Sequence, residues 1–247
     1  MATYLEICQQ VHRIIGMGSR GNTAKPGTVP TSVSGQVDEL AEIVEWVKQA
    51  WIEIQNECKW RWMVKSGTLV FASVSTVNPR ASQITTYADW VPFVEQDMFR
   101  SNRYALCYLT ASGSTAEQKL YFEEYADFRG FRDRGTVATG HPQYFTIDND
   151  REWIVYPTPD ASYTVRLDYR VEPKVLTSSD GSTNFQDYPD TGKGLPVEFH
   201  DAVAWKAVRW WAITRRDMAM LQLAEREYKS KMMRAKALYL PGPRWLA

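Results

Sequence analysis

The stretch that decides the fold covers residues 37–58 and reads VDELAEIVEWVKQAWIEIQNEC. Its apolar residues recur at alternating steps of three and four, which places them on a single stripe of an α-helix. We expect a cap near residues 33–35, with Asp38, Glu39 and Glu42 at the positive end of the helix dipole. The stripe consists of Val37, Leu40, Val44, Val47, Trp51, Ile54 and Cys58.

Two arrangements use such a stripe: a core helix packed within its own chain, and a long intermolecular coiled coil. Ile43, Trp46 and Ala50 lie beside the stripe and widen its apolar face beyond what a two-stranded seam needs. The pattern therefore favours a core helix.

The composition is that of an ordinary folded protein. The chain has 247 residues, of which 44% are hydrophobic and 23% charged, and 13% are aromatic. This length suits one elaborated domain or two small ones. Equal numbers of basic and acidic residues, 29 of each, argue against a general nucleic-acid binder.

The charge is unevenly distributed along the chain. Residues 33–60 hold six acidic and two basic residues, whereas residues 198–247 hold ten basic and five acidic ones. A basic C-terminal arm suggests docking onto an acidic partner, although a solvated helical face is the commoner explanation of such a charge run.

Cysteine usage and hydropathy predict a reduced, soluble protein. Cys8, Cys58 and Cys107 are odd in number and widely spaced, as in an intracellular protein with unpaired core thiols. We expect no signal peptide, because residues 1–17 form an amphipathic pattern. Lys206 and Arg209 interrupt the most hydrophobic run, so no membrane span is expected.

Outward from the central helix, the pattern alternates between helical and strand-like segments. Residues 4–17 predict a first helix and residues 16–35 a loop. Beyond Trp62 the runs 68–72, 104–109 and 119–125 resemble strands separated by long excursions, and residues 127–135 a helical turn or loop. Residues 144–147, 153–156 and 163–171 predict a three-stranded antiparallel meander, since the last alternates apolar and polar residues.

The C-terminal region predicts helix again. Leu195-Pro196 opens it, and an apolar stripe at helical spacing continues to Ala235. Residues 214–217 either separate two antiparallel helices or form a polar patch on one long helix. The predicted fold class is α+β: a helical bundle, made of an N-terminal helix pair and a long C-terminal helical region, with an inserted antiparallel β-sheet region. The predicted parts are residues 1–62, 63–194 and 195–247.

The motifs that would carry chemistry are weak. Residues 16–21 match GxGxxG, but they follow a helix and precede a proline-containing loop, so we interpret them as a flexible loop. His12, His141 and His200 are scattered and have no metal-ligand spacing. Asp148-Asn149-Asp150 could ligate calcium, but it lacks the later glycine and glutamate of an EF-hand loop, so we interpret it as a turn. The basic aromatic run 205–211 is interpreted as packing in preference to nucleic-acid stacking. We predict no catalytic, metal or cofactor site.

Three short motifs in order carry a resemblance to a known family. The first helical pair ends in Trp60-Arg61-Trp62; a Tyr156-Pro157-Thr158-Pro159 hairpin precedes a strand with Leu167-Asp168-Tyr169; and Leu195-Pro196-Val197-Glu198-Phe199-His200 opens the last helix. In these features the chain resembles the head-to-tail adaptor (connector) proteins of tailed bacteriophages, especially those of short-tailed phages.

The resemblance implies a non-enzymatic virion protein, assembled in the host cytoplasm and placed at the neck. It implies a ring, with twelve copies as the expected number, that binds the portal protein and a tail or nozzle protein. Genomic DNA would pass through the channel without sequence-specific binding. The residues expected to contact the portal are Arg234, Lys236, Tyr239, Leu240, Arg244, Trp245 and Leu246.

The region 75–140 is the corresponding candidate for contact with the tail side. Two other functions stay open. One is a different tail-completion or tail-tube-associated structural protein, which would share the composition. The other is a small hydrolase, which would need acidic residues converging in a cleft.

Overall fold

The computed structural model describes residues 2–18, 29–96, 101–132, 138–188 and 194–240. The chain divides into two compact units. A helical unit comprises residues 1–63 and 173–247, and a β unit comprises residues 64–172. Both ends of the chain thus belong to the helical unit, and one continuous segment supplies the β unit. The predicted three-part division at residues 62 and 194 stays a prediction.

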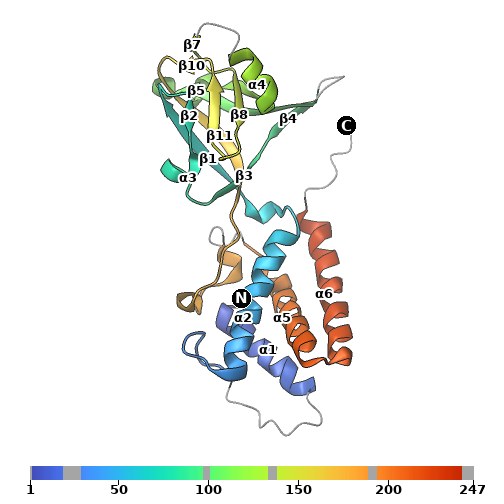
Figure 1. The fold of residues 1–247 in the computed structure, drawn as a ribbon. Coiled ribbons are helices and arrows are strands. Elements are labelled where there is room, and N and C mark those ends of the chain that lie inside the picture. The colour runs from blue at the N-terminus through green and yellow to red at the C-terminus, as the bar shows by residue number, and fades with distance from the viewer. Residues whose placement is uncertain (1, 19–28, 97–100, 133–137, 189–193, 241–247) are drawn as a thin grey trace. The chain divides into compact units, whose positions relative to one another are not determined.

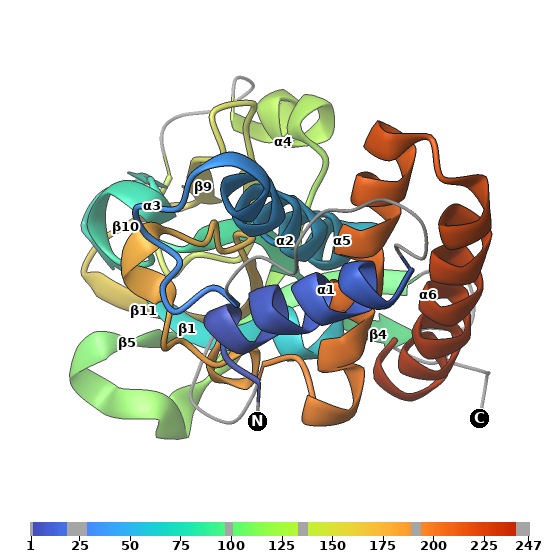
Figure 2. The ribbon, with the colours of Figure 1, turned by 90° about the horizontal axis from the view of Figure 1, so that it is seen from below.

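Within the described residues, the long helices of the helical unit are α1, α2, α5 and α6 (Figures 1 and 2). Helix α5 packs against each of the other three, because its alanines permit close approach on several sides. Shorter 3-10 helices connect or extend these helices. The bounds are α1 Tyr4–Gly18, α2 Asp38–Glu57, η1 Arg61–Met63, η3 Ser178–Asp180, η4 Phe185–Asp187, η5 Val197–Phe199, α5 His200–Arg215 and α6 Met218–Tyr239.

Helix α2 forms where the periodicity predicted it, with three local differences. Its middle and last turns bury Val47, Trp51 and Ile54, whereas Val37 at its start is 70% exposed. The predicted cap is wrong: Val37 occupies the N-cap position without a side-chain hydrogen bond. Gln55, a polar residue, is fully buried on the same face.

The C-terminal region consists of two helices, which decides between the alternatives left by the sequence. Arg216 adopts a left-handed conformation with a φ of 58° and ends α5. The Asp217 carboxylate then accepts a hydrogen bond from the Met220 N–H and caps α6. This tight connection returns α6 alongside α5 (Figure 1).

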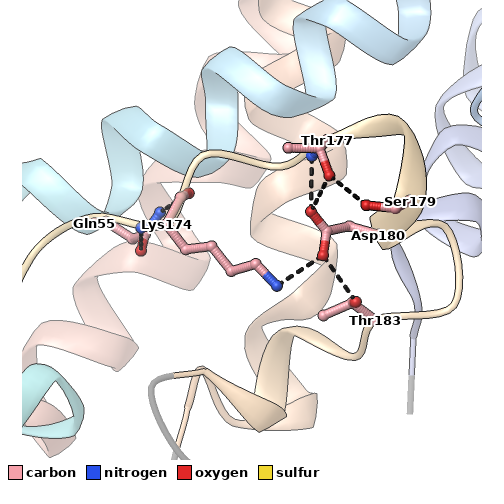
Figure 3. A network of polar contacts seen from close by, with 6 residues as sticks. All are labelled: Gln55, Lys174, Thr177, Ser179, Asp180 and Thr183. Atoms are coloured by element: carbon pink, nitrogen blue, oxygen red, sulfur yellow. Dashed lines mark hydrogen bonds and ion pairs between the residues drawn. The ribbon is translucent and has the colours of Figure 1, made fainter. Parts of the chain in front are cut away.

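The buried glutamine Gln55 anchors the segment that re-enters the helical unit. Its side chain donates to the Lys174 carbonyl and accepts from the Lys174 N–H, at 3.1 and 2.8 Å. Lys174 in turn pairs with Asp180, whose carboxylate also accepts from Thr177 and Thr183 (Figure 3). These bonds satisfy polar groups that the packing removes from water.

The β unit is built on one nine-stranded sheet and one two-stranded sheet. The path of the large sheet is β1-β11-β5-β6-β8-β9-β2, with β3 also paired to β11 and β4 to β5. The elements are β1 Val64–Ala72, β2 Thr76–Val77, α3 Pro79–Ser82, β3 Tyr87–Val91, β4 Phe93–Gln96, β5 Ser101–Leu109, η2 Thr110–Ala116, β6 Gln118–Phe122, α4 Tyr125–Arg132, β7 Thr139–Gly140, β8 Tyr144–Ile147, β9 Trp153–Tyr156, β10 Thr158–Pro159 and β11 Ser162–Val171.

The fold-class prediction was wrong. The protein has a mixed fold built around a large nine-stranded sheet, and it is not a helical bundle with an inserted antiparallel sheet. The sheet is not uniformly antiparallel, because β6 and β8 pair in parallel, as do β7 and β10 of the small sheet. The strands β2, β3 and β4 lie between residues 72 and 104, where we expected long excursions without strands. The sequence did not predict them because strands this short show little periodicity.

The predicted meander was also wrong in its pairing. Strands β8 and β9 form the expected hairpin, but β11 does not extend it. Instead β11 pairs with β1 along nine residues and also with β3 and β5. The alternation of β11 correctly identified its buried side, which includes Val165 and Leu167, because alternation fixes faces and not partners.

Candidate partner-binding surfaces

The described residues predicted to contact the portal lie at the end of α6. The Arg234 side chain is 70% exposed and lies 3.3 Å from the Glu198 carboxylate. Lys236 binds Glu57 at 2.7 Å, and the Tyr239 ring packs edge-on against Phe199. The Leu240 N–H closes the helix on the Lys236 carbonyl. Three further predicted residues, Arg244, Trp245 and Leu246, lie outside the described residues.

Much of the uneven charge of the sequence is paired inside the helical unit. Acidic residues of α2 face basic residues of the last two helices: Glu53 binds Lys206 at 3.0 Å, and Glu57 binds Lys236. Glu39 and Glu42 also lie within 4 Å of Arg215. The opposite charges of residues 33–60 and 198–247 therefore serve, in part, to attach one helix to another.

A groove of about 660 Å³ lies among α2, α5 and α6. In its lining the Tyr228 hydroxyl donates to the Glu57 carboxylate, and the Lys206 ammonium lies 4.6 Å from the centre of the Tyr228 ring. Burial alone would raise the pKa of Glu57, but the hydrogen bonds from Lys236 and Tyr228 outweigh it and lower that pKa. Burial and the Glu57 charge raise the pKa of Tyr228.

The charged side chains that line this groove pair with one another and form a structural network. Lys206 and Arg209, which belong to the basic aromatic run, bind Glu53 and Glu225 respectively. Their charges are neutralised by neighbours, so the groove holds α6 in place, in agreement with the packing interpretation of residues 205–211.

The contacts of His200 explain its place in the Leu195-to-His200 motif that precedes the last helices. The ring is 2% exposed, its Nδ1 accepts from the Ala2 N–H, and its Nε2 lies 2.9 Å from the Leu195 carbonyl. Burial lowers the pKa of His200, which keeps it neutral with the proton on Nε2. The ring thus ties the N-terminal segment to the start of α5, while Phe199 packs into the core.

The other motifs give no site within the described parts of the chain. Gly16 and Gly18 belong to the end of α1, and the rest of the GxGxxG match lies outside the described residues. Asp148 accepts hydrogen bonds from two N–H groups of its own turn. In the ranges that the structure describes, no group of three or more His, Cys, Asp or Glu side chains is arranged to hold a metal.

The β unit carries a second candidate surface, an aromatic ladder. We use this name for Phe93, Tyr104, Tyr121 and Tyr144, which lie on four neighbouring strands. Each is the direct cross-strand partner of the next, so all four share one face of the sheet. All four rings are half-buried, and the centres of Phe93 and Tyr104 lie 5.8 Å apart and those of Tyr104 and Tyr121 6.5 Å apart.

Polar groups border the ladder. Lys119 lies over the Tyr104 ring and binds Glu95 at 2.6 Å. At the other end a hollow of about 450 Å³ is lined by Asn102, Tyr121, Glu123, Tyr144 and their neighbours. Half-exposed tyrosines with a charged border are typical of protein-binding surfaces. The sequence did not single out these tyrosines, because they come from different strands and only the register of the sheet aligns them.

None of the helices in the described ranges is long and apolar enough to cross a membrane. Half-exposed aromatic rings bordered by charged side chains are typical of the surfaces with which proteins bind other proteins.

The chain belongs to the SU10 adaptor protein family, whose sequence profile matches residues 2–242. No curated relative matches the chain. The resemblance to bacteriophage head-to-tail adaptors is therefore confirmed, and the protein is a structural adaptor of the phage particle, a class that is usually non-enzymatic.

Proposed function

We propose that this adaptor forms a ring that joins the portal to the tail and extends the DNA channel. The family match over residues 2–242 carries the proposal. It is supported by two separate candidate surfaces, one on each compact unit, since a protein that joins two partners needs a surface for each. The ring places the protein at the neck of the virion.

Solution mass measurement tests the ring. We expect the purified protein to be monomeric alone and to form a defined multiple when mixed with purified portal rings, because neighbours held on a template offset the ordering cost of each contact. A protein that stays monomeric and leaves the portal mass unchanged contradicts the proposal. In that case another tail-completion role becomes the better explanation.

We assign the portal contact to the end of α6 and the residues that follow it. Arg234 and Lys236 supply positive charge there, and Tyr239, Leu240, Trp245 and Leu246 supply apolar surface. Arg234 keeps most of its side chain exposed despite its pairing with Glu198. Such an exposed ion pair contributes little to stability, so this arginine is available to a partner.

Deletion of residues 241–247 is expected to weaken binding to the portal at least tenfold and to leave the fold unchanged. The reason is the loss of one cation and two large apolar side chains from the proposed contact. Binding is measured by titration against portal rings, and folding by circular dichroism. A full-length variant with Arg244, Trp245 and Leu246 replaced by serine separates side chains from chain length. Unchanged binding by both variants contradicts the assignment.

We assign the tail contact to the aromatic ladder. The double variant Tyr104→Ser and Tyr121→Ser is expected to weaken binding to the tail or nozzle protein at least tenfold, because clustered tyrosines often dominate interface energetics. Binding to the portal is expected to stay unchanged. Tyr125→Ser, which removes a 47% exposed tyrosine outside the ladder, is the matched control. Equal tail binding by the ladder variant and the control contradicts the assignment.

A further inference from the structure

The outward face of α6 carries positive charge around an exposed methionine. Residues buried on α6 repeat along one side of the helix, so the residues half a turn away point to solvent. The side chains of Arg226 and Lys229 are 74% and 72% exposed, and Met233 is 68% exposed. We call the surface formed by Gln222, Arg226, Lys229, Met233 and Ala237 the α6 outer face.

The two cations on this face remain available to a partner. Arg226 pairs with the adjacent Glu227, and Lys229 lies 3.8 Å from Glu225 on its own helix. Exposed pairs of this kind contribute little to stability, because water screens them. Methionine adapts to irregular surfaces, and Met233 lies one turn beyond Lys229 on the same side of the helix.

The outward face of α2 carries the opposite charge at a matching spacing. Asp38, Glu42, Glu45 and Gln49 are exposed and recur at helical intervals opposite the buried residues of α2. Within the chain, Glu45 pairs with Lys48 of its own helix at 3.2 Å and Glu42 lies 3.9 Å from Arg215 of α5, and such exposed pairs contribute little to stability. We call this surface the α2 outer face. Glu42 and Glu45 are three residues apart, as are Arg226 and Lys229, so two such helices lying side by side bring both pairs of opposite charges together.

The two outer faces belong to one compact unit but cannot meet within one chain. Helix α5 packs against both α2 and α6, and each outer face lies on the side of its helix opposite the buried residues. A contact between two different faces of identical subunits is heterologous, and repeating it generates a ring when the rotation closes.

We propose that the α6 outer face of one copy binds the α2 outer face of a second copy, and that this contact joins neighbouring subunits. The inference rests on the proposed ring function and names the surfaces that form it. Charge complementarity selects a second copy of this chain as the partner, with Arg226 and Lys229 of one subunit facing Glu42 and Glu45 of the next.

A charge-swap experiment on portal rings tests this contact. Variant one carries Arg226→Glu and Lys229→Glu, and variant two carries Glu42→Lys and Glu45→Lys. Each alone is expected to give at least tenfold less ring, because like charges then meet at every contact. An equal mixture is expected to recover the ring, since alternating copies restore opposite charges at each contact when the number of copies is even. The variant with all four substitutions is expected to recover it as well.

The controls separate this contact from folding and from total charge. Circular dichroism checks each variant, and Arg13→Glu with Lys59→Glu makes the same change in net charge as variant one, at exposed residues outside both faces. Full assembly by either reversed variant, or failure of the mixture and the four-substitution variant to recover it, overturns the inference. Loss of assembly by the control pair also overturns it.

Disulfide cross-linking keeps the inference testable if the wild-type protein ignores the portal. Gln49→Cys and Met233→Cys are placed together in a chain with Cys58→Ser and oxidised at high concentration without portal. A heterologous contact gives cross-linked dimers, trimers and longer chains, whereas either cysteine alone gives dimers at most. Such cross-linked chains support the contact between subunits even if the protein does not bind the portal. If the protein neither binds the portal nor forms cross-linked chains, the proposed function and the proposed contact are both overturned.

Discussion

Replacing Trp153 by alanine is expected to lower the free energy of unfolding by about 3–5 kcal/mol, the usual cost of removing a large buried aromatic ring. Trp153 is fully buried in the β unit. Its ring stacks on Phe145 with 4.4 Å between centres, and its Nε1–H donates to the Tyr87 hydroxyl at 3.1 Å. The substitution leaves a cavity that the surrounding strands fill only in part.

Two comparison variants separate the contribution of ring packing at Trp153 from that of its hydrogen bond to Tyr87. Trp153→Phe keeps a ring against Phe145 but removes the donor to Tyr87, and it is expected to cost about 1–2 kcal/mol. Tyr125→Ala, at an exposed position, is expected to change stability by less than about 0.5 kcal/mol. Urea denaturation followed by circular dichroism gives the midpoints. A loss below about 1 kcal/mol for Trp153→Ala contradicts the prediction.

Replacing Asp180 by alanine is expected to cost about 2–3 kcal/mol at neutral pH. The carboxylate accepts hydrogen bonds from Lys174, from the N–H and hydroxyl of Thr177, and from the hydroxyl of Thr183 (Figure 3). Its side chain is 14% exposed, so these charge-assisted bonds are only partly screened by water. Without the carboxylate, Lys174 loses its partner and the capping box of η3 is broken.

The effect of Asp180 is expected to depend on pH. Burial alone would raise its pKa, but the bonds from Lys174 and Thr177 outweigh burial and lower the pKa from 3.8 to about 2. A lowered pKa means that the folded state binds the proton less tightly than the unfolded state. The contribution is therefore complete above about pH 4 and is lost as the pH falls through about 2.

Denaturation at pH 6, 4 and 2 measures this dependence. The stability difference between the wild type and Asp180→Ala is expected to shrink by about 1–2 kcal/mol between pH 4 and pH 2. Asp127→Ala, which removes an exposed carboxylate of α4, is expected to show no such change. A difference for Asp180→Ala that stays constant over this range contradicts the explanation.

The acidic α2 and the basic C-terminal helices show how far charge could be interpreted from the sequence. The counts correctly indicated opposite charges on two segments. They left open whether the basic arm met a partner or solvent, and the structure adds a third explanation, the pairing of Glu53 with Lys206 and of Glu57 with Lys236. Side chains far apart in sequence meet only when helices pack, so residue counts alone could not reveal this pairing.

By itself the sequence determined the long helices, the buried face of β11 and the motif that begins α5, because each is set by spacing over a few residues. Only the tertiary structure decided the partners of β11, the burial of Gln55 and the alignment of Phe93, Tyr104, Tyr121 and Tyr144. Local periodicity states which side of an element is apolar. It does not state which distant strand or helix will cover that side, because that choice depends on the packing of the whole unit.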